Sequence, residues 1–140
     1  MAKEIGNADD TNIRKTPQCT AVLKSLKNNY GHPTASDIHN DVIEEFPNIS
    51  LATVYNNLKK LTKNNIIQEV YVKNGPSRFD KNPSVHYHMI CNNCGEMKDL
   101  SYPILNEIEY FARGLHNFVT SSHEFNLYGI CDKCQSKIDY

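Results

Sequence analysis

The sequence has no long hydrophobic run, and its apolar stretches are only a few residues long, as at Ile66 and Ile67. A bilayer-spanning helix needs about 20 consecutive apolar residues, and residues 1–5 lack the apolar stretch of a secretory signal. We therefore expect a soluble cytoplasmic protein.

The sequence also lacks an excess of charge of either sign. Fifteen basic residues face sixteen acidic residues, and the formal net charge is −1. Residues 1–80 carry a net charge of +1 and residues 81–140 a net charge of −2. Composition therefore gives no reason to expect nucleic acid or membrane as a partner, and any such partner must be argued from local pattern.

Internal repeats and low-complexity tracts are absent as well, which excludes a solenoid. A chain of 140 residues with 39% hydrophobic residues is long enough for one ordinary domain, or for two small ones that share a modest core.

What the sequence does have is four cysteines in two pairs, Cys91 with Cys94 and Cys131 with Cys134. Two residues between the members of a pair let both sulfurs face one point, and four thiolates suit a tetrahedral zinc ion. Disulfides are the alternative, but the reducing cytosol favours metal binding. A fifth cysteine, Cys19, falls on an apolar helical stripe and is expected in the core.

A second group of candidate ligands has nitrogen and oxygen donors. His86 and His88 are one residue apart, so on a strand both side chains lie on the same face, and Asp80 and Asp99 flank them in the sequence. His32 is a fifth candidate, with an exposed loop histidine as the alternative interpretation. Such a set accepts Fe(II), Mn(II) or Zn(II), and the sequence does not select among them.

The order of elements indicates an α+β protein with an N-terminal winged helix-turn-helix domain and a small α/β dimerisation domain that carries the four-cysteine zinc site. Caps, prolines and apolar periodicity predict helices over residues 17–29, 34–46 and 51–64, followed by a hairpin of residues 67–73 and 77–80. Residues 81–84 read as a hinge. We therefore divide the chain into domains 1–80 and 85–140.

Strands are predicted at residues 87–91, 97–100 and within 118–128, with a helix at 103–115 and a short helical tail. Residues 1–13 are expected to form a frayed arm.

The predicted third helix has one apolar side and one polar side. A third helix that follows a tight turn and precedes a hairpin is where helix-turn-helix domains place the helix that reads DNA. An ordinary solvated surface helix is the alternative.

The candidate DNA contacts combine small and amide-bearing residues for bases with cations for phosphates. They are Arg14, Lys15, Ser50, Ala52, Thr53, Tyr55, Asn56, Lys59 and Lys60, with Lys63 as a further cation. Because this set of cations is small, we expect a homodimer on a two-fold operator in double-stranded DNA.

In this order, the motifs resemble those of the ferric uptake regulator (Fur) superfamily of metal-dependent repressors, and most of all its peroxide-sensing branch (PerR). The matching stretches are Thr16-Pro17-Gln18, His32-Pro33-Thr34-Ala35, residues 50–58, Arg78-Phe79-Asp80, His86-Tyr87-His88 and residues 91–95. The resemblance implies a structural zinc on the four cysteines and a regulatory Fe(II) or Mn(II) on His32, Asp80, His86, His88 and Asp99.

The resemblance further implies a function. In PerR-like proteins Fe(II) reduces hydrogen peroxide and a ligating histidine becomes 2-oxo-histidine, which matches His32 and His86 here. An iron- or manganese-responsive Fur-type repressor of metal uptake without peroxide sensing is the alternative.

Two departures from the family pattern bear on the alternatives. Val85 and Tyr87 occupy positions where iron regulators place extra metal ligands. His123 therefore lacks expected co-ligands, which favours the peroxide-sensing hypothesis. The short N-terminal arm and Cys19 also depart from the pattern.

Two further functions compete with a histidine-based sensor. A hydrolytic enzyme would need an open metal position and a general base, and no unassigned residue lies at a spacing that indicates one, so we expect no enzymatic activity. A switch made by oxidation of the zinc-binding thiols is the third reading.

Overall fold

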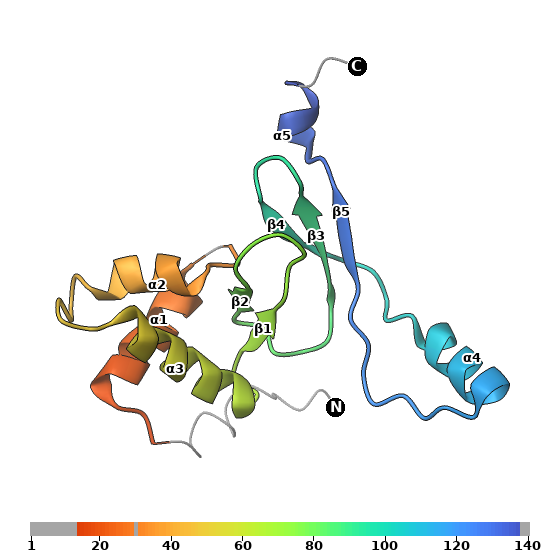
Figure 1. Cartoon of the computed structure of the whole chain (residues 1–140), viewed down its shortest axis with the longest axis horizontal. Coiled ribbons are helices and arrows are strands. Elements are labelled where there is room, and N and C mark those ends of the chain that lie inside the picture. Colours follow the sequence, from red (N-terminus) through yellow and green to blue (C-terminus); the bar gives the residue numbers. More distant parts are fainter. Residues whose placement is uncertain (1–13, 30, 138–140) are drawn as a thin grey trace. The chain divides into compact units, whose positions relative to one another are not determined.

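The structure, a computed structural model, describes residues 14–29 and 31–137 (Figure 1). It divides into two compact units, Met1–Ser84 and Val85–Tyr140. The predicted frayed arm, residues 1–13, lies outside the described residues. The Gln68 amide donates to the carbonyls of Asn82 (2.7 Å) and Ser84 (2.9 Å), so the end of the predicted hinge is held to the first unit.

Three helices open the first unit, and each begins at a side-chain cap. They are α1 (Pro17–Asn28), α2 (Ala35–Val42) and α3 (Leu51–Lys63). The hydroxyls of Thr16, Thr34 and Ser50 accept from backbone N–H groups three residues ahead, which satisfies donors that the first helical turn would leave open. The prediction that the second helix runs to residue 46 was wrong. The chain leaves the helix after Val42, and the turns that follow let Ile43 and Phe46 pack against the core.

The core of this unit is built from the inward faces of the three helices and from the wing. Two short strands, β1 (Gln68–Val70) and β2 (Arg78–Asp80), pair antiparallel with Gln68 opposite Asp80, and they make a shorter wing than predicted. Phe79, Leu58 and Leu61 are fully buried in this core. Cys19 is fully buried there too, which confirms its predicted structural role. The unit is a winged helix-turn-helix, as predicted (Figure 1).

The wing is tied to the loop before α2. The Phe79 N–H donates to the carbonyl of Pro33 (2.8 Å), and the Arg78 guanidinium donates to the carbonyl of His32 (3.0 Å). These two bonds fix the loop beside the end of β2, where Asp80 lies.

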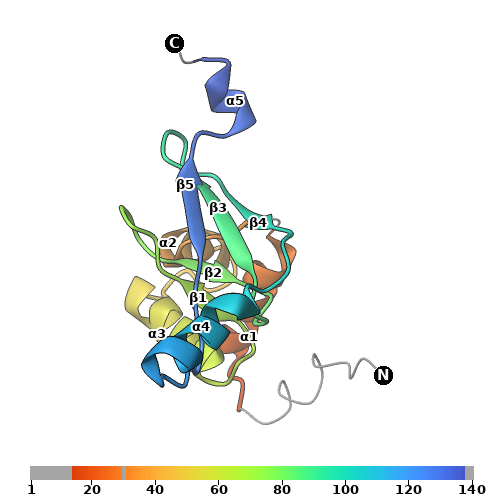
Figure 2. The ribbon, with the colours of Figure 1, turned by 90° about the vertical axis from the view of Figure 1, so that its right-hand side faces the viewer.

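The second unit contains a three-stranded sheet in the order β4-β3-β5. The strands β3 (Tyr87–Cys91) and β4 (Met97–Leu100) form the predicted hairpin, and β5 (Asn126–Gly129) runs parallel to β3 (Figure 2). Only the end of the predicted strand 118–128 is a strand. The preceding residues form an extended connection with Phe118 and Val119 exposed.

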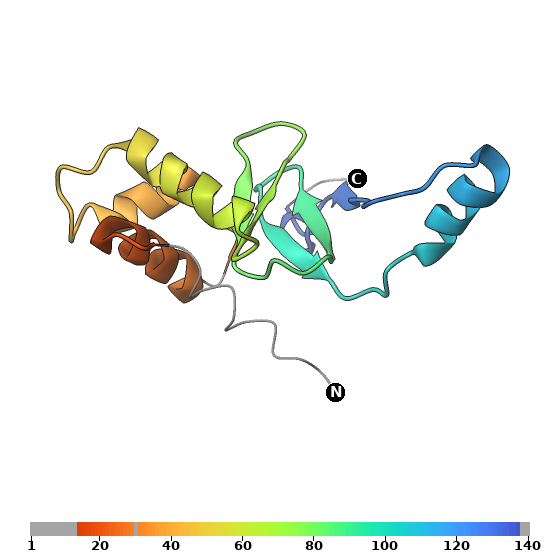
Figure 3. The ribbon, with the colours of Figure 1, turned by 90° about the horizontal axis from the view of Figure 1, so that it is seen from below.

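The helix α4 (Asn106–His116) begins three residues later than predicted, and the short helix α5 (Asp132–Gln135) forms the predicted tail. Within this unit α4 stands apart from the sheet at the end of two extended connections (Figure 3). None of its residues is buried, although Ile108, Phe111 and Leu115 are large apolar side chains. Among the described residues, no helix is long and apolar enough to cross a membrane.

Candidate metal centres and DNA-reading surface

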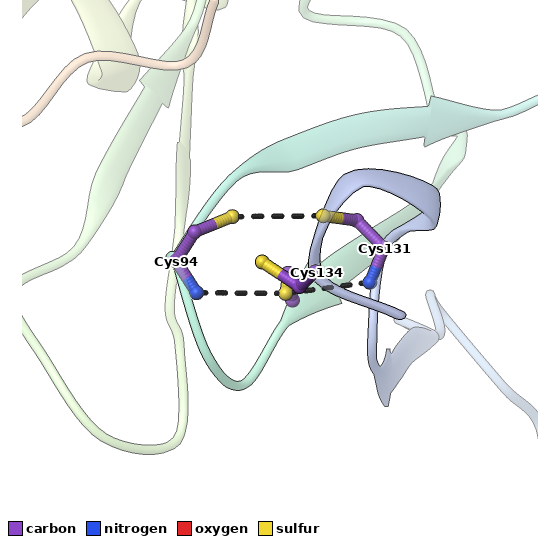
Figure 4. Close-up of side chains that lie close together, drawn as sticks. Cys94, Cys131 and Cys134 are labelled. Carbon is purple, nitrogen blue, oxygen red and sulfur yellow. Dashed lines mark hydrogen bonds between the residues drawn. The ribbon is translucent and has the colours of Figure 1, made fainter. Parts of the chain in front are cut away.

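The four paired cysteines meet at one point of the second unit. Cys91 ends β3, and Cys94 lies in the knuckle that follows. Cys131 is the N-cap residue of α5, and Cys134 lies within that helix (Figure 4). One donor atom from each lies within 4.8 Å of the others, and the sulfurs of Cys94 and Cys131 are 3.7 Å apart. Four sulfurs at about 2.3 Å from a tetrahedral zinc are about 3.8 Å from one another, whereas a disulfide needs about 2.05 Å. The geometry fits a four-coordinate metal, and all four thiols are free.

Local backbone geometry prepares this cluster for an ion. The N–H groups of Cys94 (3.5 Å) and Cys131 (3.4 Å) donate to the sulfur of Cys91 and lower its pKa to about 6. The Cys134 N–H lowers the pKa of Cys131, but burial and the neighbouring sulfurs outweigh it and raise that pKa to about 11. A cation bound at the centre would favour the thiolate form of each sulfur.

The second unit also holds three of the predicted nitrogen and oxygen donors. His88 lies on β3 directly opposite Asp99 on β4, and His86 immediately precedes β3. The Oδ1 atom of Asp99 is 3.1 Å from Nε2 of His86 and 3.5 Å from Nε2 of His88. The two imidazole rings have their centroids 4.5 Å apart. The spacing of one residue therefore brings both rings to one carboxylate, as expected.

The first unit holds the other two predicted donors as a pair. Nε2 of His32 lies 3.1 Å from Oδ2 of Asp80. Asp80 is the last residue of β2, and its other oxygen accepts from the N–H of Asn82 (2.9 Å), which fixes the carboxylate. His32 is thus an ordered partner of Asp80 and not an exposed loop histidine.

The remaining histidines have other roles. The ring of His123 is held by the Tyr87 hydroxyl at Nε2 (2.6 Å) and by Glu109 at Nδ1 (3.0 Å). Tyr87 also accepts from the N–H of Leu105 (2.8 Å), so this network ties both connections of α4 to β3. His39 is only partly exposed, and its ring bonds the carbonyl of Ile49 (2.9 Å).

The outer face of α3 presents the predicted DNA-reading residues. Ala52, Tyr55, Asn56, Lys59 and Lys63 are exposed, and Thr53 and Lys60 are partly exposed. Ser50 and Thr53 are bound to each other at the helix start. The Lys60 ammonium donates to the carbonyl of Arg14, which brings the segment that contains Arg14 and Lys15 to the end of α3.

Glu69 lies beneath this surface and was not among the residues predicted from the sequence. It lies on β1, is buried, and bonds both Lys59 (2.8 Å) and Tyr55 (3.4 Å) of α3. Its position in the strand could have indicated burial. Side chains alternate along a strand, so Glu69 lies on the same face as the buried Ile67.

Comparisons with known proteins decide the family. A sequence model described as the ferric uptake regulator family matches residues 10–128. The chain belongs to this family. The resemblance stated from its motifs is thereby confirmed.

Individual relatives agree with that assignment. The chain is 41% identical over 137 residues to the peroxide-responsive repressor PerR of Staphylococcus aureus strain Mu50, which covers 98% of this chain and 93% of that protein. Its fold is similar to the crystal structure of the Campylobacter jejuni peroxide stress regulator, with 32% identity, a TM-score of 0.69, and coverage of 84% and 89% of the two chains. It is also similar to that of the Vibrio cholerae ferric uptake regulator, with 25% identity, a TM-score of 0.69, and coverage of 87% and 95%.

Replacement of one sulfur tests the four-cysteine centre. We expect Cys94→Ser to lose the tightly bound metal and to lower the melting temperature of the second unit, because metal binding energy is folding energy at a structural site. Elemental analysis and thermal denaturation measure both effects, with Cys19→Ser as a control that keeps the metal. A metal-free Cys94→Ser protein as stable as wild type would contradict the assignment.

Proposed function

We propose that the chain is a metal-dependent transcriptional repressor that binds operator DNA as a homodimer and senses hydrogen peroxide by oxidation of a histidine. The observation that carries the proposal is the presence of two chemically distinct donor sets, one of thiols and one of imidazoles and carboxylates, in a chain of the ferric uptake regulator family. The name of the Staphylococcus aureus relative supports the peroxide role. No part of the proposal requires enzymatic turnover.

The four-cysteine centre takes structural Zn(II). Zinc prefers four thiolates in a closed tetrahedron, and such a site has no open position for chemistry. Its task is to join the end of β3 to α5, residues that are far apart in the chain.

The regulatory ion is Fe(II) or Mn(II), held jointly by His32 and Asp80 of the first unit and His86, His88 and Asp99 of the second. Two imidazole–carboxylate sets without sulfur suit these ions. Neither set alone supplies enough donors to fill the coordination of such an ion. Joint binding would hold the two units in one orientation and so present α3 of each protomer to successive major grooves.

Peroxide sensing depends on which ion is bound. Fe(II) held by these residues would supply the redox chemistry that cleaves the O–O bond of hydrogen peroxide; one oxygen atom would be added to the ring of His32 or His86, and the other would leave as water. An oxidised ring is a poorer ligand, so metal and DNA are released. Mn(II) does not carry out this reduction, and the manganese form is insensitive.

Exposed apolar surface supports the homodimer. Ile108, Phe111 and Leu115 lie at i, i+3 and i+7 along α4 and are 54%, 66% and 72% exposed. An apolar helical stripe left in water is unfavourable and marks an interaction surface. A second copy of the same chain covers it with closed two-fold symmetry.

Removal of one regulatory ligand separates the two metal functions. We expect His86→Ala to abolish Mn(II)-dependent binding to operator DNA while zinc content and melting temperature stay near those of wild type. Fluorescence anisotropy with an operator selected from a random duplex library measures binding, and His116→Ala, an exposed histidine at the end of α4, is the control. If His86→Ala binds the operator like wild type, the regulatory site is misassigned.

Peroxide treatment tests the sensing chemistry. The Fe(II) form should gain one oxygen on the peptides that contain His32 or His86 and lose DNA binding, whereas the Mn(II) form should do neither. Tryptic mass spectrometry reads the modification. Disulfides among the four cysteines, together with unmodified histidines, would contradict histidine oxidation and support a thiol switch. An iron form that does not respond to peroxide would support a repressor that responds to metal alone.

A charge on the apolar stripe tests the dimer surface. We expect Leu115→Glu to convert the protein to monomers, because a carboxylate on each copy cannot be desolvated at a two-fold contact. Sedimentation measures the mass, and Arg113→Glu serves as a charge-changing control on the same helix. A dimeric Leu115→Glu protein would place the interface elsewhere.

A further inference from the structure

The wing of the first unit contains a buried carboxylate with four side-chain donors. The side chain of Glu69 is 2% exposed, and its oxygens accept from Ser77 (2.5 Å), Lys59 (2.8 Å), Tyr71 (3.2 Å) and Tyr55 (3.4 Å). Tyr55 and Lys59 lie on α3, whereas Tyr71 directly follows β1 and Ser77 directly precedes β2. One carboxylate therefore joins the proposed reading helix to the wing.

Glu69 is ionised at neutral pH. Burial alone would raise its pKa, but the hydrogen bonds from Lys59 and Ser77 outweigh burial and hold the pKa below its usual value. The same contact raises the pKa of Lys59, so the two side chains form a pair of full charges.

Lys59 is held in place but remains at the surface. Its side chain is 44% exposed, and its ammonium lies 5.1 Å from the centre of the Tyr55 ring and 6.0 Å from that of Tyr71. Tyr55 in turn packs edge-on against the buried Phe79 of β2, with ring centres 6.3 Å apart. Tyr55 and Lys59 are thus held in one orientation on the face of α3 proposed to contact DNA.

We propose that Glu69 determines the DNA specificity of this protein by holding Tyr55 and Lys59 for base readout and by cancelling the charge of Lys59 toward phosphates. The proposal rests on the proposed DNA-binding function. An unpaired lysine attracts every duplex, because phosphate contacts carry no sequence information. A lysine already paired with a buried carboxylate adds little to that general attraction, so binding depends more on the contacts to bases.

A purely structural role for Glu69 predicts different behaviour. If the carboxylate only stabilised the wing, its loss would weaken binding to all duplexes together without changing the number of phosphate contacts. The dependence of affinity on salt counts those contacts and separates the two roles, since each additional contact steepens the slope of log K against log salt by about 0.9.

The test compares Glu69→Gln with wild type, both zinc-loaded and with Mn(II), on the selected operator and on a random duplex of equal length. We expect the random duplex to bind about 3- to 10-fold more tightly at low salt with a slope steeper by about 0.9, and the operator preference to fall by a similar factor. Glu124→Gln, an exposed carboxylate of the second unit, makes the same change in net charge and should leave the slope unchanged. An unchanged slope in Glu69→Gln, or equal weakening on both duplexes, overturns the proposal.

A second pair of variants keeps the test decisive if Glu69→Gln does not fold. The double variant Lys59→Gln with Glu69→Gln removes both charges of the pair and should leave the random-duplex slope unchanged, whereas Lys63→Gln on the same helix should reduce the slope by about 0.9. A double variant whose slope is reduced as much as that of Lys63→Gln would show that Glu69 does not cancel the charge of Lys59.

Heparin retention distinguishes this proposal from the function on which it rests, because heparin is a polyanion without bases. Glu69→Gln should elute at higher salt than Glu124→Gln. If wild type binds no duplex and the heparin shift is still present, the proposed repressor function is contradicted, but the proposal that Glu69 cancels the charge of Lys59 is supported. If wild type binds its operator and the heparin shift is absent, the repressor function is supported, but the proposed role of Glu69 is contradicted.

Discussion

The alternation of side chains along β3 is the constraint on which the chemistry of the second unit depends. Successive residues of a strand point to opposite faces, so His86 and His88 share one face and Tyr87 and Cys91 the other. The first face meets Asp99 across the β3–β4 pairing, and the second meets the His123 network and the sulfur cluster. One short strand thereby keeps hard and soft donors apart, and a shift of register by one residue would exchange the two sets.

The thiol centre gives this strand a fixed end. Cys91 and Cys94 enclose a tight knuckle, and Gly95, directly after Cys94, has a φ of 77°, a conformation that a residue with a side chain rarely adopts. Cys131 and Cys134 join that knuckle to the segment after β5. Under the proposed function, a metal at this point stabilises the unit without taking part in sensing, and the donors proposed for sensing can lose their ion while the fold persists.

Sequence spacing predicted the features that arise from local geometry. The Cys-x-x-Cys pairs, the His-x-His pair, the three capped helices and the β3–β4 hairpin all depend on residues close together in the chain, where periodicity and caps decide the structure. The Tyr87–His123–Glu109 network was missed because its partners come from three separate segments of the second unit. Glu69 was missed although its partners are near in sequence, because periodicity within each element does not show which side chains of α3 and of the wing meet. The strand expected over residues 118–128 is short for a related reason, since only Asn126–Gly129 finds β3 as a pairing partner.

In the proposed function, thiolates hold one ion, and imidazoles with carboxylates hold another of different chemistry. X-ray absorption at the zinc and manganese edges of protein loaded with both metals tests it most directly. We expect four sulfur neighbours at about 2.3 Å around zinc and only nitrogen and oxygen neighbours around manganese. Nitrogen in the zinc shell, or sulfur in the manganese shell, would contradict it.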